Sequence, residues 1–195
     1  MKLLAITALL LPTTTLAQRV KFTREVFSSG PGCPPASVRP VFSNNNETVT
    51  ITFDNFRASL PSPPGIREIA CSLDIRVTHP QGRSTVNPIA TLIGDVNLGA
   101  GVTGLVRRNY VVSPTTAKPP TGEINPPPLT FTGPVVTGFI EDDRFSYTEN
   151  FTAGPGQNRT VSIKLNDATL QLQQNGGNEG SLRQVVYILD IRSQS

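Results

Sequence analysis

The sequence is poor in the side chains that carry most enzyme chemistry. Its 195 residues include one histidine, two cysteines, one methionine and no tryptophan. Histidine is the usual general base because its unperturbed pKa is about 6.5. The only one, His79, precedes Pro80 in a segment that we expect to form a turn, and no Gly-x-Ser-x-Gly elbow accompanies it. These shortages argue against a Ser-His-Asp hydrolase.

Metal and thiol sites are limited in the same way. One histidine and two cysteines leave only oxygen ligands for a metal. The cysteines also lack the Cys-x-x-Cys spacing that is typical of reactive or metal-binding thiols. We therefore predict that the protein uses no cofactor.

Aromatic and basic residues are scarce as well. Sugar-binding clefts usually offer aromatic platforms, and this chain has only Tyr110, Tyr147 and Tyr187 beside its phenylalanines. Lys and Arg exceed Asp and Glu by three, 17 against 14. The longest basic run is Arg107-Arg108, so the clustered basic surface that binds nucleic acid is not expected.

No hydrophobic run is long enough to span a bilayer, which takes about 20 residues. The N-terminus instead has one cation, Lys2, an apolar stretch over Leu3–Leu11 and small residues that end at Ala17. This layout is typical of a secretory signal peptide. We predict a signal peptide over residues 1–17, a mature chain over 18–195 and an extracellular location without a membrane span.

Secretion changes how the two cysteines are interpreted. Two thiols in one extracellular chain usually pair. A bridge between Cys33 and Cys71 would close a loop of about 40 residues and stabilise the fold by roughly 3–4 kcal/mol.

Three sequons agree with the secretory route. Asn46, Asn150 and Asn158 each begin an Asn-x-Thr triplet in or next to segments rich in Asn, Gly or Thr. We predict N-glycosylation at these positions, which would then face water.

Hydrophobic residues alternate with polar ones along most of the mature chain. Ile69, Cys71, Leu73, Ile75 and Val77 alternate with polar or small residues, which predicts a strand with Cys71 on its buried face. Further strands are predicted over 47–56, 159–174 and 182–193, where Val185, Tyr187, Leu189 and Ile191 share one face. Less regular candidates are 38–42, 85–96, 102–112, 129–131 and 137–152.

These eight to ten strands define the predicted fold class. No segment of the mature chain has the period of an amphipathic helix, and 18 prolines and several Asn- and Gly-rich turns separate the strands. We predict an all-β fold, an antiparallel jelly-roll-like β-sandwich in a single domain. The proline-rich stretch 113–128 is predicted to be an exposed loop, because proline cannot donate to a sheet ladder.

Several motifs of the chain resemble one known family. They are GPGCPPASV from Gly30, TVTITFDNFRAS from Thr48 and CSLDIRVTHPQG from Cys71, followed by weaker matches at FTGPVV and VVYILDIRS. This pattern resembles the secreted, mostly fungal family described as domain of unknown function 4360. The resemblance implies a secreted β fold and a Cys33–Cys71 bridge, and it implies no assigned chemistry.

The sequence departs from that family at two places. Family members commonly carry further cysteines, but residues 146–156 and the C-terminal tail have none. The stiff Gly-Pro-Gly-Cys-Pro-Pro segment therefore carries the only bridge, which would pin the N-terminal arm to the strand of Cys71. Core packing has to hold the rest.

The densest carboxylate cluster is Glu141-Asp142-Asp143. Carboxylates on a loop are possible calcium ligands, since calcium takes six to eight oxygens. The triplet is equally compatible with the polar tip of a hairpin between Ile140 and Phe145, and no Asp-x-Asp-x-Asp spacing is present.

The function hypotheses follow from these limits. We predict a secreted, non-catalytic protein that acts by surface binding at the cell wall or, in an effector-like role, on a host or competitor. Its partner would be an extracellular protein or a cell-wall glycan. The alternative is a polysaccharide-active hydrolase with paired carboxylates, for which Asp54, Glu68, Asp74 and Asp190 are available. A calcium-dependent binding module is the third hypothesis.

Overall fold

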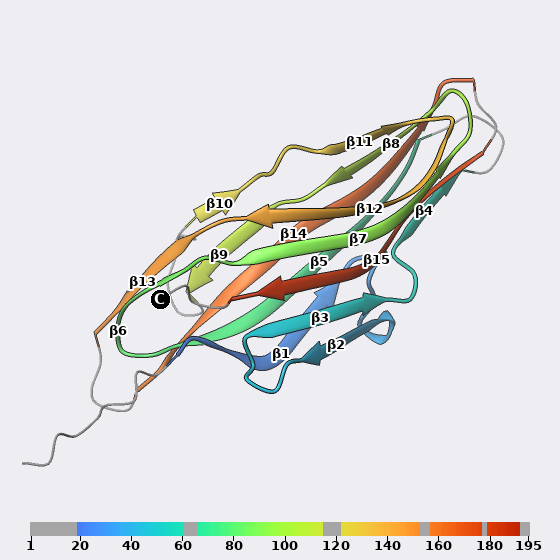
Figure 1. Cartoon of the computed structure of the whole chain (residues 1–195). Coiled ribbons are helices and arrows are strands. Elements are labelled where there is room, and N and C mark those ends of the chain that lie inside the picture. Colours follow the sequence, from blue (N-terminus) through green and yellow to red (C-terminus); the bar gives the residue numbers. More distant parts are fainter. Residues whose placement is uncertain (1–18, 61–65, 115–121, 153–156, 177–178, 192–195) are drawn as a thin grey trace, which may run out of the picture.

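The computed structural model describes residues 19–60, 66–114, 122–152, 157–176 and 179–191. In this part of the chain fifteen strands and one short 3-10 turn (Pro35–Ser37) form two antiparallel sheets and a small two-stranded sheet (Figure 1). The two large sheets pack face to face around one hydrophobic cluster. The predicted antiparallel β-sandwich is thus confirmed. The predicted signal peptide lies outside the described residues.

The first sheet has seven strands. Its main path is β1-β5-β14-β8-β11, and β9 and β10 extend it beside the first half of β14. The bounds are β1 Lys21–Ser29, β5 Ile66–His79, β8 Val102–Arg107, β9 Tyr110–Pro114, β10 Gly122–Ile124, β11 Leu129–Thr132 and β14 Arg159–Gln174.

The second sheet has six strands. Its path is β12-β7-β15-β3-β2, with β4 paired to the first half of β15. The bounds are β2 Val38–Phe42, β3 Thr48–Phe53, β4 Arg57–Leu60, β7 Ile89–Leu98, β12 Val135–Arg144 and β15 Gly180–Asp190. The strands β6 (Gly82–Val86) and β13 (Tyr147–Phe151) pair at one end of the sandwich (Figure 1).

The sequence pattern accounts for most of these strands, because alternate side chains of a strand point to opposite faces. In β5 the residues Cys71, Leu73, Ile75 and Val77 are buried, as predicted. The other expected strands are present too, but several are split in two by a turn, as at β6/β7, β8/β9 and β12/β13. The sequence did not predict β1, because a bulge around Arg24 breaks its alternation.

A second bulge corrects the predicted phase of β15. The pairing of β15 with β7 shifts between Gln184 and Val186, so that one extra residue is inserted. Gln184 and Tyr187 are both fully buried, whereas Val185 is only partly buried. The prediction that Val185 shares the buried face was wrong for this reason.

The proline-rich stretch 113–128 is not a loop throughout. Gly122–Ile124 form β10, which pairs with β9, whereas the side chains of Glu123, Asn125 and Pro127 are exposed. Residues 115–121 lie outside the described residues. The stretch therefore includes a short edge strand, a position that tolerates neighbouring prolines.

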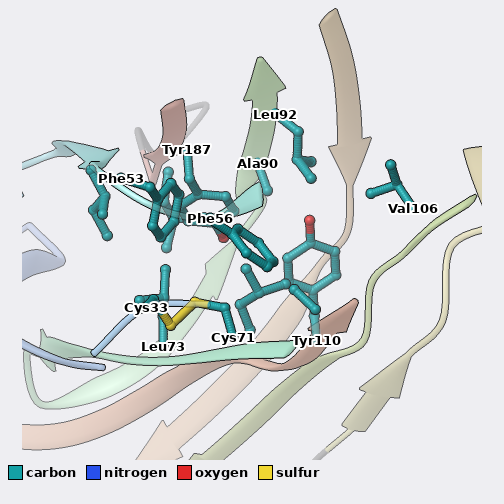
Figure 2. Close-up of a cluster of buried hydrophobic side chains, with 14 of the residues drawn as sticks. Cys33, Phe53, Phe56, Cys71, Leu73, Ala90, Leu92, Val106, Tyr110 and Tyr187 are labelled. Carbon is teal, nitrogen blue, oxygen red and sulfur yellow. A yellow bond between two sulfur atoms is a disulfide. The ribbon is translucent and has the colours of Figure 1, made fainter. Parts of the chain in front are cut away.

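The core lies between the two sheets. Figure 2 shows Phe53, Phe56 and Tyr187 above the cysteine pair, while Tyr110 points its hydroxyl group toward the middle of the sandwich. All four aromatic side chains are at most 2 % exposed. No helix in the described ranges is long and apolar enough to cross a membrane.

Candidate functional site

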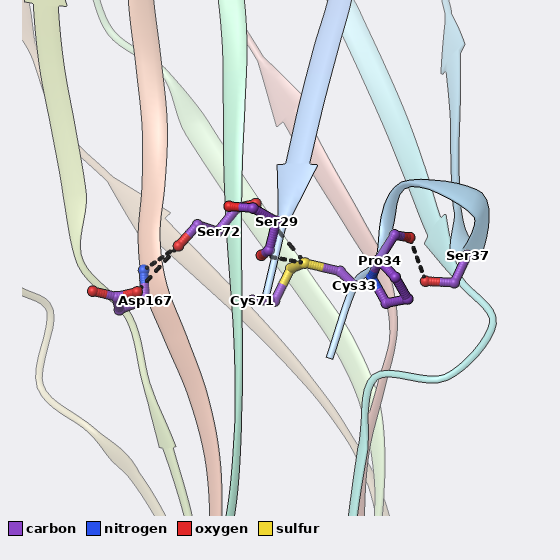
Figure 3. Close-up of a disulfide and its surroundings, with 7 residues drawn as sticks. All are labelled: Ser29, Cys33, Pro34, Ser37, Cys71, Ser72 and Asp167. Atoms are coloured by element: carbon purple, nitrogen blue, oxygen red, sulfur yellow. Dashed lines mark hydrogen bonds between the residues drawn. A yellow bond between two sulfur atoms is a disulfide. The ribbon is translucent and has the colours of Figure 1, made fainter. Parts of the chain in front are cut away.

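The two cysteines join the end of β1 to β5. The sulfur atoms of Cys33 and Cys71 lie 2.00 Å apart and their Cα atoms 5.3 Å apart, which is disulfide distance. Both residues are fully buried, so the predicted inward position of Cys71 is confirmed. The Cys33 sulfur also lies 3.2 Å from the carbonyl oxygen of Ser29 and 3.8 Å from that of Ser72 (Figure 3).

Two glycines explain the rigid sequence before Cys33. Gly30 has a φ of +108°, and a Cβ atom there would lie 2.7 Å from the carbonyl oxygen of Ala70. A Cβ atom on Gly32 would lie 2.5 Å from the ring of Phe56. The Gly-Pro-Gly-Cys segment thus lets the backbone approach β5 closely, and the amide of Gly32 donates to the carbonyl of Ala70 over 2.9 Å.

An open hollow lies on the outer face of the seven-stranded sheet, over the same strands. We call it the Phe27 hollow. It has a volume of about 340 Å³ and extends over β1, β5 and β14. Its lining includes Phe27, Ser29, Ser72, Asp74, Lys164 and Asn166.

The ring of Phe27 is the apolar part of this hollow. It is 51 % exposed, and the guanidinium group of Arg76 lies 4.7 Å from the ring centroid. Arg76 also forms a 3.0 Å ion pair with Glu25. These contacts fix the orientation of an aromatic side chain that remains half in water.

The polar part of the hollow is ordered by hydrogen bonds. Asp74 accepts a 2.7 Å hydrogen bond from Ser162, and its second carboxylate oxygen lies 3.9 Å from the ammonium group of Lys164. Lys164 keeps 43 % of its side chain exposed. Asp74 is the one carboxylate among the hollow's described lining residues.

The bulge of β14 joins this polar group to the cysteine pair. Asp167 has a φ of +47°, and its backbone amide donates to Ser72 Oγ over 3.1 Å. The Ser72 hydroxyl in turn donates to Asp167 Oδ1 over 3.1 Å (Figure 3). Ser72 follows Cys71 directly, so the bridge and the bulge together position this wall of the hollow.

The acidic triplet does not form the tip of a hairpin, and that prediction was wrong. All three residues lie within β12, so alternation sends Asp142 to one face and Glu141 and Asp143 to the other. Asp142 accepts from Thr91 over 2.6 Å. The described residues contain no cluster of three His, Cys, Asp or Glu side chains that could hold a metal ion. The geometry therefore gives no support to a calcium site at the triplet.

Asp143 instead belongs to a buried ion pair between the sheets. Its carboxylate accepts hydrogen bonds from Arg108 Nε (2.9 Å) and Nη2 (2.8 Å) and from the hydroxyl of Tyr110 (2.7 Å). Burial alone would lower the pKa of Arg108, but the hydrogen bonds and charge of Asp143 raise it above its ordinary value. Burial raises the pKa of Tyr110. The two raised pKa values favour a charged guanidinium group and a neutral phenol, which is what a structural hydrogen-bonded cluster requires.

His79 lies at the end of a strand, directly before the connection at Pro80, but its side chain is buried. It ends β5 with no exposed surface, and its ring nitrogens lie 2.8 Å from Ser84 Oγ and 2.9 Å from Tyr147 Oη. Burial, with a smaller contribution from the positive charge of Arg159, lowers the pKa of His79 to about 4. The neutral ring therefore bridges β5, β6 and β13 as donor and acceptor.

The three sequons share one end of the sandwich. Asn150 and Asn158 are exposed, and Asn46 is partly buried at the β2–β3 turn, where it accepts from Arg24. Asn150 pairs with Arg83 in the small sheet, and Asn158 precedes the first residue of β14, which pairs with His79. N-glycosylation at these positions stays a prediction.

A second hollow of about 350 Å³ lies at the other end, over the six-stranded sheet. It is lined by Arg57, Ser59, Leu60, Asn97, Gly99, Glu179, Gly180 and Ser181. None of these residues is aromatic, so this hollow offers no ring to a ligand. The remaining carboxylates of the hydrolase hypothesis are dispersed, and Asp54 pairs with Arg39 over 3.0 Å.

Sequence reasoning missed Phe27, Arg108 and the burial of Asp143. One signal was available: Asp143 lies in phase with Phe139 and Phe145, and Arg108 lies in phase with Val106 and Tyr110. A charged residue at a position where the alternation predicts burial needs an oppositely charged or hydrogen-bonding partner. No such signal existed for Phe27, because β1 does not alternate.

Comparison with known proteins gives relatives but no activity. An uncharacterized secreted protein of Arthroderma benhamiae is 27% identical over 136 residues, which are 69% of this chain and 53% of that protein. The chain thus spans about half the length of this relative. The description of this relative as secreted agrees with the expected secreted family.

Two solved structures align with most of the chain. TmCBM61 in complex with β-1,4-galactotriose is 16% identical, with 86% of this chain and 89% of that chain covered and a TM-score of 0.30. A CBM4 structure is 11% identical, with 82% and 86% covered and a TM-score of 0.21. Both TM-scores are low, so nothing about this chain is inferred from either.

The family comparison covers most of the chain. A family model described as Domain of unknown function (DUF4360) matches residues 22–191. The match includes both cysteines, all strands from β2 to β15 and the three sequons. The resemblance noted from the motifs is confirmed, and the chain belongs to the DUF4360 family.

Proposed function

We propose that this protein is a secreted, non-catalytic glycan-binding protein that contacts cell-wall polysaccharide through the Phe27 hollow. The cell wall concerned is that of the producing organism, a host or a competitor. The observation that carries the proposal is the combination of an exposed, oriented aromatic ring with fixed polar groups in one open hollow.

A sugar ring has an apolar face and a rim of hydroxyl groups, and the hollow offers a counterpart to each. The half-exposed ring of Phe27 is suited to the C–H face of a sugar, since its orientation is fixed by Arg76. An open, pre-formed site with few polar groups is typical of small-ligand recognition.

The hydroxyl rim would meet both donors and acceptors. The ammonium group of Lys164 and the exposed amide of Asn166 donate, and the carboxylate of Asp74 accepts. Because Asp74 already accepts from Ser162, its orientation does not have to be fixed when ligand binds.

The carboxylate content of the hollow supports binding without turnover. Glycoside hydrolysis by the common mechanisms needs two carboxyl groups on either side of the scissile bond, about 5–10 Å apart. The hollow's described lining supplies Asp74 alone. An open position on a sheet also gives little shielding with which to raise the pKa of an acid.

The test is retention on insoluble polymers. Purified mature protein is incubated with chitin, β-glucan, pectin and xylan, and the bound fraction is measured by depletion. We expect saturable binding to at least one polymer, and Phe27→Ala is expected to weaken it about ten-fold. Leu105→Ala is the matched control, because Leu105 is an apolar outward residue of the same sheet on β8.

Two results would overturn the proposal. One is no saturable retention on any of these polymers, or equal retention of Phe27→Ala and the wild type. The other is sustained release of reducing sugar that is abolished by Asp74→Asn, which would favour the hydrolase alternative. The secretory route is tested separately, by a drop in apparent mass on enzymatic deglycosylation of protein from its native host.

A further inference from the structure

The small sheet of β6 and β13 continues the edge of the six-stranded sheet at one end of the sandwich (Figure 1). The ladder between β7 and β12 is interrupted at Pro88 and Phe145, and it resumes where Val86 pairs with Tyr147. We call the two strands β6 and β13 the flap. Within the described ranges the backbone ladder of the flap joins these two strands only. Its attachment to the seven-stranded sheet therefore depends on side chains.

These side chains meet at the ends of β5 and β14. The register places His79 of β5 opposite Arg159 of β14, so both side chains share the inner face of the sheet. The ring nitrogens of His79 lie 2.8 Å from Ser84 Oγ and 2.9 Å from Tyr147 Oη. Glu149 forms a 3.6 Å ion pair with Arg159. Ser84, Tyr147 and Glu149 all belong to the flap, so these contacts join it to the seven-stranded sheet.

The contact surface accommodates a neutral imidazole but not a charged one. Burial and the positive charge of Arg159 lower the pKa of His79 to about 4. The hydroxyl groups of Ser84 and Tyr147 can accept as well as donate, so a protonated ring would keep both hydrogen bonds. The one carboxylate on the inner face of the flap, Glu149, is paired with Arg159 and not with the ring. A proton on His79 thus adds a second buried cation beside Arg159.

Other charged groups at this end do not compensate that cation. Lys21 of β1 lies opposite Thr78, so it shares the outer face with Thr78, whereas the next residue, His79, points inward. Arg83 of β6 is exposed on the outer side of the flap. Further charged residues of this region pair with one another, as in Arg19–Glu47 and Arg144–Asp142.

We propose that the flap is an acid-sensitive latch, which stays docked on β5 and β14 while His79 is neutral and is released when the ring takes up a proton. Release exposes His79 and Arg159 to water, which solvates the added charge. The contribution of the neutral ring to docking is fully present above pH 6.5 and is lost as the pH falls toward 4.

The topology makes the release local. A two-stranded sheet is only marginally stable by itself, so the flap depends on its docking contacts. The strands β5 and β14 are each paired on both sides and do not have to separate when the flap leaves. Val86 and Tyr147, which are 0% and 8% exposed in the docked flap, become accessible on release. Acid would therefore uncover an apolar surface at this end of the sandwich.

The first experiment is amide hydrogen exchange of the mature protein at pH 7 and pH 5. Each exchange rate is divided by the intrinsic rate at the same pH, which gives a protection factor. We expect the protection factors of the β6 and β13 amides to fall about 20-fold between the two pH values, because the free ring has its ordinary pKa. The amides of the β3–β15 ladder are expected to keep their protection.

Variants separate the ring from the rest of the flap. His79→Gln does not titrate and is expected to give the same flap protection at both pH values. Thr85→Ala is the matched control, because the Thr85 hydroxyl bonds Thr148 on the outer side of the flap; it should keep the 20-fold fall of the wild type. Glu149→Gln removes the partner of Arg159 and is expected to lower flap protection about ten-fold already at pH 7. Circular dichroism at pH 7 establishes that each variant is folded.

Three results would overturn the latch. Flap protection could be equal at pH 7 and pH 5, or it could fall equally in the flap and in the β3–β15 ladder, which would mean global unfolding. The wild type and His79→Gln could also lose the same protection, which would exclude the imidazole as the cause. None of these measurements involves a glycan, so they bear on the latch and not on the proposed function.

Discussion

The two outer faces of the sandwich have the same backbone pattern and expose different hydrophobic side chains. On the seven-stranded sheet the outward residues of β5 and β14 include Ser72, Asp74, Arg76 and Lys164, and the one exposed large apolar group is Phe27. On the six-stranded sheet the outward positions of β12 and β15 include Val136, Ile140, Val186 and Ile188, interspersed with polar and charged residues such as Asp142 and Arg144. The second surface thus exposes aliphatic side chains where the first exposes one aromatic ring.

The difference shows that burial of the core does not determine the outer residues. Alternation is satisfied when every second residue is apolar, whatever the others are. The polar groups of the first face are ordered by hydrogen bonds, whereas the exposed aliphatic side chains of the second gain free energy only where they are covered.

The largest expected effect comes from breaking the contact that holds the two sheets together. Asp143→Asn removes the close countercharge of the buried guanidinium group of Arg108, because Asp143 supplies both of its short side-chain contacts. Glu141 remains, but its carboxylate is half-exposed and lies 3.9 Å away. Loss of one partner of a buried ion pair destabilises a protein by about 3–5 kcal/mol. Chemical denaturation at one protein concentration measures the change.

Asp95→Asn is the control for this variant. Asp95 lies on the exposed side of β7, so its neutralisation is expected to change the free energy of unfolding by less than about 0.5 kcal/mol. Equal losses in the two variants would contradict a structural role of the buried pair. Loss of only one of the two sheets would show that the sheets fold separately.

The second largest effect is expected from removing the disulfide beside the Phe27 hollow. Removing the Cys33–Cys71 bridge by serine substitution at both positions is expected to cost about 3–4 kcal/mol. It should also weaken polymer retention, because the bridge and its neighbour Ser72 position one wall of the Phe27 hollow.

The bridge itself is checked on the wild type. Alkylation without reductant followed by mass spectrometry should modify neither cysteine. Modification of both would contradict the bridge. A bridged protein whose double serine variant binds polymers normally would instead separate the bridge from the hollow.

The sequence predicted the class of fold because alternation is local, and it failed where strands are interrupted. The bulge at Val185 inserts one residue, so the side chains on its two sides no longer follow a single alternation between the two faces of the sheet. The sequence contains no signal for this insertion. The chain around Phe27 does not alternate, so the hollow depends on pairings between residues far apart in the sequence. The buried charges were predictable in principle, because Arg108 and Asp143 each lie in phase with buried neighbours.

The smallest effect lies at the sequon end and belongs to neither face. The pKa of His79 is lowered from about 6.5 when unfolded to about 4 when folded, so the unfolded chain binds the extra proton first. Its contribution is fully present above pH 6.5 and is lost as the pH falls toward 4. By linkage the loss in the free energy of unfolding at pH 5 amounts to about 2 kcal/mol.

His79→Gln keeps polar contacts toward Ser84 and Tyr147 but does not titrate. We therefore expect the free energy of unfolding of the wild type to fall more steeply than that of His79→Gln between pH 7 and pH 5. Parallel profiles would contradict a buried neutral imidazole, and a titration of His79 near pH 6.5 by NMR would do the same.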